Sequence, residues 1–284
     1  MAITNEMIKK LREMTGAGMM DCKHALQESG GSLEAAVEIL RKKGAAVAQK
    51  RGDRAAKEGM IVTRVSRDGK TGVIVEINCE TDFVGRSDDF SAYAAAVAET
   101  IAAHRPKTTE ELRSLKTPGG RTVAELTNDL LAKVGEKIDV RRFNVMESSD
   151  GAIFSYTHLG NKIGVLVECV NLANDSAGTV VGRDVAMQIA AMNPMTVGRE
   201  EIVKDTIERE LDIYRTQAKN EGKPAPIVEK IAAGRLEKFY QEVCLLEQIF
   251  VKDGGKTIRD YLAETGKGTT VKRFQRYHLG EEAR

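Results

Sequence analysis

Tryptophan is absent from this 284-residue sequence, and aromatic residues make up only 5% of it. So few aromatic side chains argue against a surface that stacks sugars or nucleic-acid bases. The sequence also has almost no net charge, because 43 Lys and Arg residues balance 42 Asp and Glu residues. A near-neutral chain has no strongly basic footprint for nucleic acid. We therefore expect no direct nucleic-acid partner.

Cysteine is scarce, and the four residues present, Cys22, Cys79, Cys169 and Cys244, lie far apart. Their spacing fits neither a CxxC pair nor a zinc ribbon, and it is typical of reduced, buried thiols in a cytoplasmic protein. The N-terminal segment 1–13 has no apolar stretch typical of a signal peptide. No apolar run approaches the roughly 18 residues of a membrane helix. We expect a cytoplasmic protein that does not enter a membrane.

Motifs for catalysis and for cofactor binding are also missing. Residues 250–257 end like a phosphate-binding loop, but Phe250 stands where its first glycine is required. Gly16-Ala17-Gly18 begins like a dinucleotide fingerprint, but Asp21 stands at its third glycine position. The four histidines are scattered, and no second pair of metal ligands accompanies any of them. We predict no catalytic residue, no metal site and no cofactor.

The N-terminal region has the pattern of three short helices. Apolar residues recur at helical spacing from Ile3 to Met14, and a second helix is expected over 19–28. Ser32 is a suitable N-cap for the third helix. Residues 41–57 then contain seven Lys or Arg and one Asp, which is typical of a solvated linker. We predict a three-helix domain over 1–45 and a basic linker over 46–58.

From Gly59 onward, an α+β pattern occurs twice. Two alternating apolar segments flank Asp68-Gly69, which is a strong hairpin signal, and helices and a further strand follow. The segments that resemble each other are Gly72–Asn78 and Gly164–Asn171, Val97–Pro106 and Val185–Pro194, and Val140–Val145 and Val271–Arg276. The fold class is therefore α+β, with one subdomain over 59–148 and a related one over 149–198 and 244–284.

An inserted segment over 199–243 interrupts the second subdomain. It contains two apolar stripes at helical spacing, joined by the Gly222–Pro226 turn, which predicts an antiparallel coiled-coil hairpin. The stripes are formed by Val203, Ile207, Leu211, Tyr214 and Ala218, and by Val228, Ala232, Leu236, Phe239 and Val243. We expect this hairpin to serve as a structural arm or as a surface that binds a partner.

The loop after the strand that ends at Asn78 contains an apolar pair, Phe83-Val84, between charged residues. The pair would either plug the core under the sheet or form an exposed anchor for a partner. Composition alone favours the plug. The repeat favours the anchor, because the corresponding segment after Asn171 contains no Phe.

Three motifs resemble the bacterial translation elongation factor Ts family: Leu11–Leu26, Asn78–Val84, and His158 followed by Ile163–Val167. The resemblance covers almost the whole chain. It implies a ubiquitin-associated-like (UBA-like) three-helix domain, a core of two related subdomains and a coiled-coil insertion. It also implies guanine-nucleotide exchange on elongation factor Tu, in its GDP-bound and nucleotide-free states. Many members continue with a C-terminal helix after the final strand, so we expect this chain either to bind its partner with a smaller footprint or to compensate elsewhere.

The resemblance also assigns roles to residues. Thr81, Asp82, Phe83 and Val84 would form a loop that enters the GTPase near its magnesium ion, with Phe83 as a wedge and Asp82 disturbing the magnesium and phosphate surroundings. His158 would contact another domain of the partner. Three residues would contact it from the N-terminal domain: Arg12, Met19 and Met20.

Three other functions stay open at this point. A UBA-like binding module on a scaffold would hold its main affinity in residues 1–50. A nucleic-acid binder would use the basic run 41–57, and its affinity would fall steeply with salt. An enzyme would have a site around Cys79 and His104. The sequence also leaves open whether the coiled-coil arm mediates a homodimer.

Overall fold

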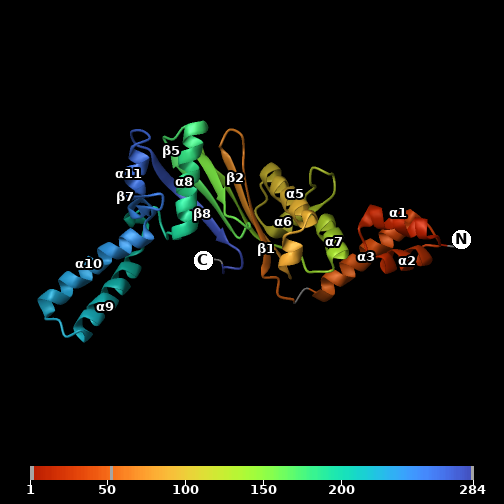
Figure 1. The fold of residues 1–284 in the computed structure, drawn as a ribbon, viewed down its shortest axis with the longest axis horizontal. Coiled ribbons are helices and arrows are strands. Elements are labelled where there is room, and N and C mark those ends of the chain that lie inside the picture. Colours follow the sequence, from red (N-terminus) through yellow and green to blue (C-terminus); the bar gives the residue numbers. More distant parts are fainter. Residues whose placement is uncertain (1–2, 52–53, 283–284) are drawn as a thin grey trace.

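The structure is a computed structural model that describes residues 3–51 and 54–282, with the side chains of 44–51 left out. Figure 1 shows an elongated arrangement of helices and small sheets. Three helices lie at the N-terminal end, two long antiparallel helices lie at the opposite end, and two three-stranded sheets flanked by helices lie between them. Within these residues, every helix is too short or too polar to cross a membrane.

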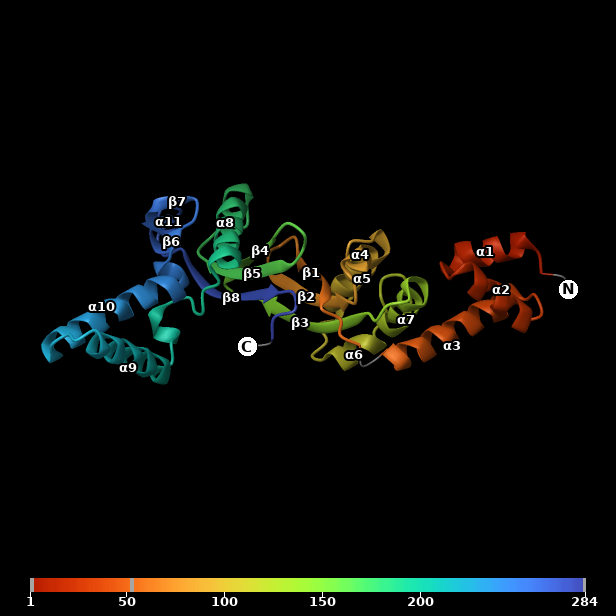
Figure 2. The same cartoon turned by 60° about the horizontal axis from the view of Figure 1, so that its bottom comes forward.

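The N-terminal helices are α1 (Asn5–Thr15), α2 (Met19–Glu28) and α3 (Leu33–Arg51). Gly16, with φ of 68°, ends α1, and the Ser32 hydroxyl caps α3 by accepting the Ala35 N–H at 3.3 Å. Fully buried Leu11 and Leu26 lie at the centre of a small apolar core. The basic run is helical as far as Arg51, and α3 leads towards the rest of the molecule beside α7 (Figure 2).

The first sheet is antiparallel and has the order β1-β2-β3. Its strands are β1 (Glu58–Val65), β2 (Thr71–Cys79) and β3 (Asp139–Glu147). As predicted, the Asp68-Gly69 turn joins β1 to β2, with Gly69 at φ of 69°. Its helices are α4 (Asp82–Gly85), α5 (Asp88–His104), α6 (Thr109–Ser114) and α7 (Val123–Val134), and α5 packs its buried face on β1 and β2.

The second sheet has the same arrangement, with the order β4-β5-β8. Its strands are β4 (Gly151–Thr157), β5 (Ile163–Val170) and β8 (Thr270–His278). The elements around it are α8 (Ser176–Met192), α11 (Ile258–Ala263), β6 (Ile249–Phe250), β7 (Asp253–Thr257), and the 3₁₀ turns Arg199–Glu201 and Leu245–Glu247. Each sheet has one irregularity of register at the corresponding place, after Glu76 and after Glu168. This is the arrangement that the internal repeat predicts.

The two sheets pack face to face, so β2 and β5 are buried on both faces. Val73, Val75 and Ile77 lie in the core under α5, whereas Ile74 lies with Leu166 between the sheets. Glycine occupies the corresponding close contacts of the two strands. A Cβ on Gly72 would lie 2.7 Å from Ile153 Cγ2, and a Cβ on Gly164 would lie 2.5 Å from Ile61 Cγ2. Only residues without a side chain permit this approach.

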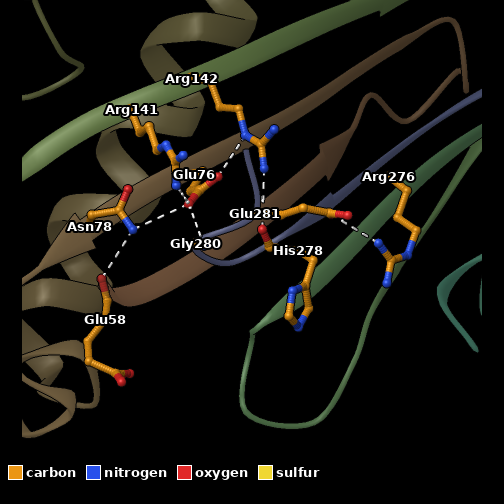
Figure 3. A network of polar contacts seen from close by, with 9 residues as sticks. All are labelled: Glu58, Glu76, Asn78, Arg141, Arg142, Arg276, His278, Gly280 and Glu281. Atoms are coloured by element: carbon orange, nitrogen blue, oxygen red, sulfur yellow. Dashed lines mark hydrogen bonds and ion pairs between the residues drawn. The ribbon is translucent and has the colours of Figure 1, made fainter. Parts of the chain in front are cut away.

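A buried carboxylate lies at the corresponding position of each central strand. Glu76 and Glu168 are both 0% exposed. Glu76 Oε2 accepts a hydrogen bond from Arg142 Nε at 2.7 Å, and Glu168 Oε2 accepts one from Arg273 Nε at 2.6 Å. Glu76 Oε1 also accepts the backbone N–H of Gly280 at 2.9 Å, as Figure 3 shows. Removing either partner would leave a buried charge unpaired, so Glu76 fastens the C-terminal segment to the first sheet.

The inserted segment forms two helices, α9 (Lys204–Asn220) and α10 (Ala225–Val243), which lie side by side in both views. Their contact buries Ala218, Val228 and Ala232, all at predicted stripe positions. The expectation for Val203 is wrong. It is 67% exposed because it precedes the first turn of α9.

We expect Gly164→Ala to lower the free energy of unfolding by about 1–3 kcal/mol, because its new Cβ would overlap Ile61. Gly234→Ala is the matched control, because Gly234 lies in α10 with nothing within 4 Å of its Cβ position. This control should stabilise the protein by about 0.5–1 kcal/mol. Urea unfolding followed by circular dichroism measures both changes. An unchanged or increased stability of Gly164→Ala would contradict the packing described.

Candidate functional site

The loop after β2 is a single ordered helical turn, α4, with a cap on each side. At its start, the Thr81 hydroxyl accepts the Val84 N–H at 3.4 Å. At its end, the Ser87 hydroxyl donates to the Val84 carbonyl at 2.8 Å and accepts the Phe90 N–H at 3.3 Å. Ser87 therefore closes the turn and caps α5 at the same time.

Phe83 and Val84 point in different directions from this turn. Phe83 is 84% exposed, whereas Val84 is half-buried against the core under α5. The core-plug hypothesis is therefore wrong for Phe83, and Val84 is the residue that fixes the turn to the sheet. An exposed aromatic side chain on an ordered turn is suited to burial in a partner, which would contribute about 2–3 kcal/mol.

Asp82 lies beside Phe83 on the outside of the turn. Asp82 Oδ2 lies 3.0 Å from Arg86 Nη2, so the two residues form an ion pair. The Asp82 side chain is 40% exposed and the Arg86 side chain is 78% exposed. Exposed pairs of this kind contribute about 0–1 kcal/mol. Asp82 can therefore exchange Arg86 for another cation or N–H at little cost.

Small residues let the turn lie directly on the start of β1. The Cβ position of Gly85 is 3.4 Å from both Gly59 N and Cys79 Sγ, so the turn and strand are in van der Waals contact. The Cys79 thiol donates to the Thr81 carbonyl at 3.1 Å. Burial, with a contribution from Glu136, raises the pKa of Cys79 to about 12. The thiol thus stays protonated at neutral pH and keeps this hydrogen bond.

His158 lies exposed at the turn between β4 and β5. Its Nδ1 is 3.0 Å from the Tyr156 hydroxyl. The next residue, Leu159, is 90% exposed, and the motif did not identify it. The turn is held against the first sheet, because the Asn161 carbonyl accepts the Ile61 N–H at 2.7 Å. His158 and Leu159 are therefore presented together on a fixed turn.

The structure brings α4 and the His158 turn to the same end of β1. Gly85 contacts Gly59 on one side, and Lys162 Nζ, just after the His158 turn, lies 2.7 Å from Glu58 Oε2. The two segments come from different halves of the repeat. Both segments therefore lie close to the start of β1.

Arg12, Met19 and Met20 do not join this cluster. They are exposed, with Met19 at 60% and Met20 at 59%, and both views place α1 and α2 beyond α7, at the far end of the molecule. Met14, expected on the buried side of α1, is instead 59% exposed. Exposed methionine side chains are flexible and apolar, and they adapt readily to different contacts.

Within the described ranges, no three His, Cys, Asp or Glu residues are placed to hold a metal ion. The four cysteines are buried and unbridged, as predicted. A hollow of about 620 Å³ lies beside β8, lined by residues that include Arg142, Met195 and Arg276, and it does not include α4. The exposed turn thus lies outside this hollow.

Comparisons with known proteins agree on one family. A family model described as Elongation factor TS matches residues 80–281. The chain is 48% identical over 283 residues to Elongation factor Ts of Clostridium botulinum (strain Eklund 17B / Type B), covering 98% of this chain and 93% of that protein. It is 45% identical over 287 residues to Elongation factor Ts of Chloroherpeton thalassium, covering 99% of both.

We expect the free energy of unfolding to fall as the pH rises from about 9 towards 12. In this window the unfolded chain loses the Cys79 proton near its ordinary pKa of 9.0, whereas the folded protein keeps it up to about 12. The folded state then binds more protons, so stability decreases, by up to about 1.4 kcal/mol per pH unit for this group. Chemical unfolding at several pH values measures the slope. Cys79→Ala should reduce it, and an equal slope in both proteins would contradict the assignment.

Proposed function

The chain belongs to the elongation factor Ts family, and on that basis we propose that it is a guanine-nucleotide exchange factor for the GTPase elongation factor Tu. One observation supports the site above all others: Phe83 is 84% exposed on a turn fixed by hydrogen bonds. The factor would act in the cytoplasm, without cofactor, catalytic residue or direct contact with nucleic acid. It would bind the GTPase with GDP and without nucleotide.

The proposal includes a division of the chain. Residues 1–45 would be a UBA-like domain and 46–58 a basic linker. Helix α3 extends into this linker as far as Arg51. The core subdomains would be 59–148, and 149–198 with 244–284. Residues 199–243 would be a coiled-coil arm, which the ion pairs Arg215–Glu229 and Arg235–Glu221 between α9 and α10 support.

In the proposed mechanism, Thr81–Val84 enters the GTPase near its bound magnesium ion. Phe83 would insert between two helices of the partner. Asp82, which pairs with Arg86 in the free protein, would turn towards the magnesium and phosphate surroundings and weaken their contacts with GDP. No bond is made or broken, because the factor needs only to stabilise the opened partner.

The energetics require more than this wedge. A thousandfold faster release needs about 4 kcal/mol of transition-state stabilisation, whereas burying Phe83 supplies about 2–3 kcal/mol before any cost of opening the partner. The remainder would come from Asp82, which would disturb the magnesium and phosphate surroundings, while a second grip would hold the partner throughout exchange. His158 and Leu159 would provide this grip beside the turn, and Arg12, Met19 and Met20 would extend it at the N-terminal end.

Linkage then fixes the order of affinities. If the factor weakens GDP binding, GDP weakens binding of the factor by the same ratio. The factor must therefore bind nucleotide-free elongation factor Tu more tightly than the GDP-bound form. The complex would dissociate when a new nucleotide binds to the GTPase.

We expect Asp82→Ala/Phe83→Ala to slow GDP release by about 30- to 160-fold, because the roughly 2–3 kcal/mol of Phe83 burial is lost. Release of a fluorescent GDP analogue from elongation factor Tu measures the rate. Val180→Ala is the matched control, since Val180 is 58% exposed but lies on α8, away from the turn. This variant should accelerate GDP release as much as the parent does. Equal rates for the double variant and the parent would remove the turn from the mechanism. A folded parent that does not accelerate release would refute the proposed function.

His158→Ala and Leu159→Ala should mainly weaken binding. Because the second grip holds the partner throughout exchange, its loss should raise the half-saturating concentration about tenfold and change the maximal rate little. Titration of the factor in the same release assay separates the two quantities. Ile213→Ala, 42% exposed on α9, serves as control. A lower maximal rate at unchanged half-saturation would contradict the role of a grip.

A further inference from the structure

The connection between α7 and β3 holds the exposed turn through a carboxylate far away in the sequence. Glu136 Oε2 accepts the Thr81 backbone N–H at 2.9 Å, and Glu136 Oε1 accepts the Thr81 hydroxyl at 2.7 Å. Both oxygens of one carboxylate thus bind the first residue of the turn. Hydrogen bonds to an ionised acceptor are about twice as strong as neutral ones.

The connection and the turn also bind each other in the opposite direction. Glu80 Oε1 accepts the Lys137 backbone N–H at 2.8 Å. Neighbouring residues of each segment therefore exchange carboxylate-to-amide hydrogen bonds: Glu136 holds Thr81, and Glu80 holds Lys137. Gly135, with φ of 71°, ends α7 and directs the chain into this contact.

The Thr81 hydroxyl has one proton, and Glu136 determines where it points. Because that proton is donated to Glu136, the oxygen lone pairs remain for the Val84 N–H at 3.4 Å. The Glu136 contact therefore sets the cap that closes the turn. Phe83 gains little from packing, since it is 84% exposed, so the turn depends for its order on Val84 in the core and on the polar contacts at its base.

We infer that Glu136 is a positioning residue for nucleotide exchange: it orders Thr81 so that Asp82 and Phe83 are held in their binding geometry before the partner arrives. This inference rests on the proposed function. Glu136 acts through Thr81, and its effect is entropic, because an ordered turn loses less freedom when it inserts. The second grip does not depend on the turn. Replacing Glu136 should therefore lower the maximal exchange rate and leave the half-saturating concentration of the factor almost unchanged.

The test uses the full chain with Glu136→Ala, Glu136→Gln, Thr81→Val and the double variant Glu136→Ala/Thr81→Val. Glu136→Ala should reduce the maximal rate of GDP release about tenfold and change half-saturation less than about twofold. Glu136→Gln should fall between parent and Ala, because its one carbonyl oxygen still accepts from Thr81. The double variant should lose less exchange activity, in free-energy terms, than the two single variants together, since both substitutions remove the same Thr81–Glu136 contact. Glu99→Ala, which removes an exposed carboxylate on α5, is the control.

A second readout needs no GTPase. Chymotrypsin cleaves after an accessible Phe only when the surrounding chain opens, so cleavage after Phe83, read by mass spectrometry, reports the order of the turn. Glu136→Ala should be cut about tenfold faster at equal thermal stability.

The outcomes separate this inference from the proposed function. If Phe83→Ala slows exchange but Glu136→Ala does not, the inference is overturned and the function stands. If Phe83→Ala exchanges like the parent, the proposed role of the turn fails and the positioning role in exchange fails with it. Unchanged cleavage after Phe83 in Glu136→Ala overturns the inference by itself.

Discussion

The close packing of β2 on β5 is the constraint on which the rest of the structure depends. Gly72 and Gly164 let the two sheets approach, and Glu76 and Glu168, each paired with an arginine, lie at corresponding positions in their central strands. Because both strands are buried on both faces, the helices must cover the outer faces. The turns at the strand ends are then the parts that face outwards. Phe83 and His158 lie on such turns, beside the start of β1.

A rigid support solves a physical problem that an exposed wedge creates. A side chain that is to be buried in a partner cannot be fixed by its own packing beforehand. The turn instead relies on Val84 in the core, on small residues at Gly59 and Gly85, and on the Glu136 carboxylate. These contacts leave Phe83 exposed and, in the proposed mechanism, would limit the entropy lost on insertion. The two exposed turns come from different subdomains, so their spacing depends on the sheet packing.

Local patterns predicted the elements well, and contacts between distant residues were beyond them. Helix α7 begins and ends at local cap residues, Thr122 and Gly135, and the repeat predicted the shared strand order. Apolar spacing misassigned Met14, since it cannot tell a buried apolar face from an exposed one. It also left the Phe83-Val84 pair undecided, because a one-residue difference in direction separates core from surface. Nothing near Glu136 in the sequence indicates its contact with Thr81, and Glu76 is indistinguishable from a surface strand residue until Arg142 lies beside it.

The central claim is that the Thr81–Val84 turn is ordered before it meets elongation factor Tu. Hydrogen exchange of the full chain, alone and bound to the nucleotide-free GTPase, tests this claim most directly. The account predicts that the Thr81 and Val84 amides are already protected in the free protein, because both are hydrogen-bonded. In the complex, the segment around His158 should gain protection together with the turn. Exchange of the free turn at the rate of an unfolded chain, with protection only in the complex, would contradict it.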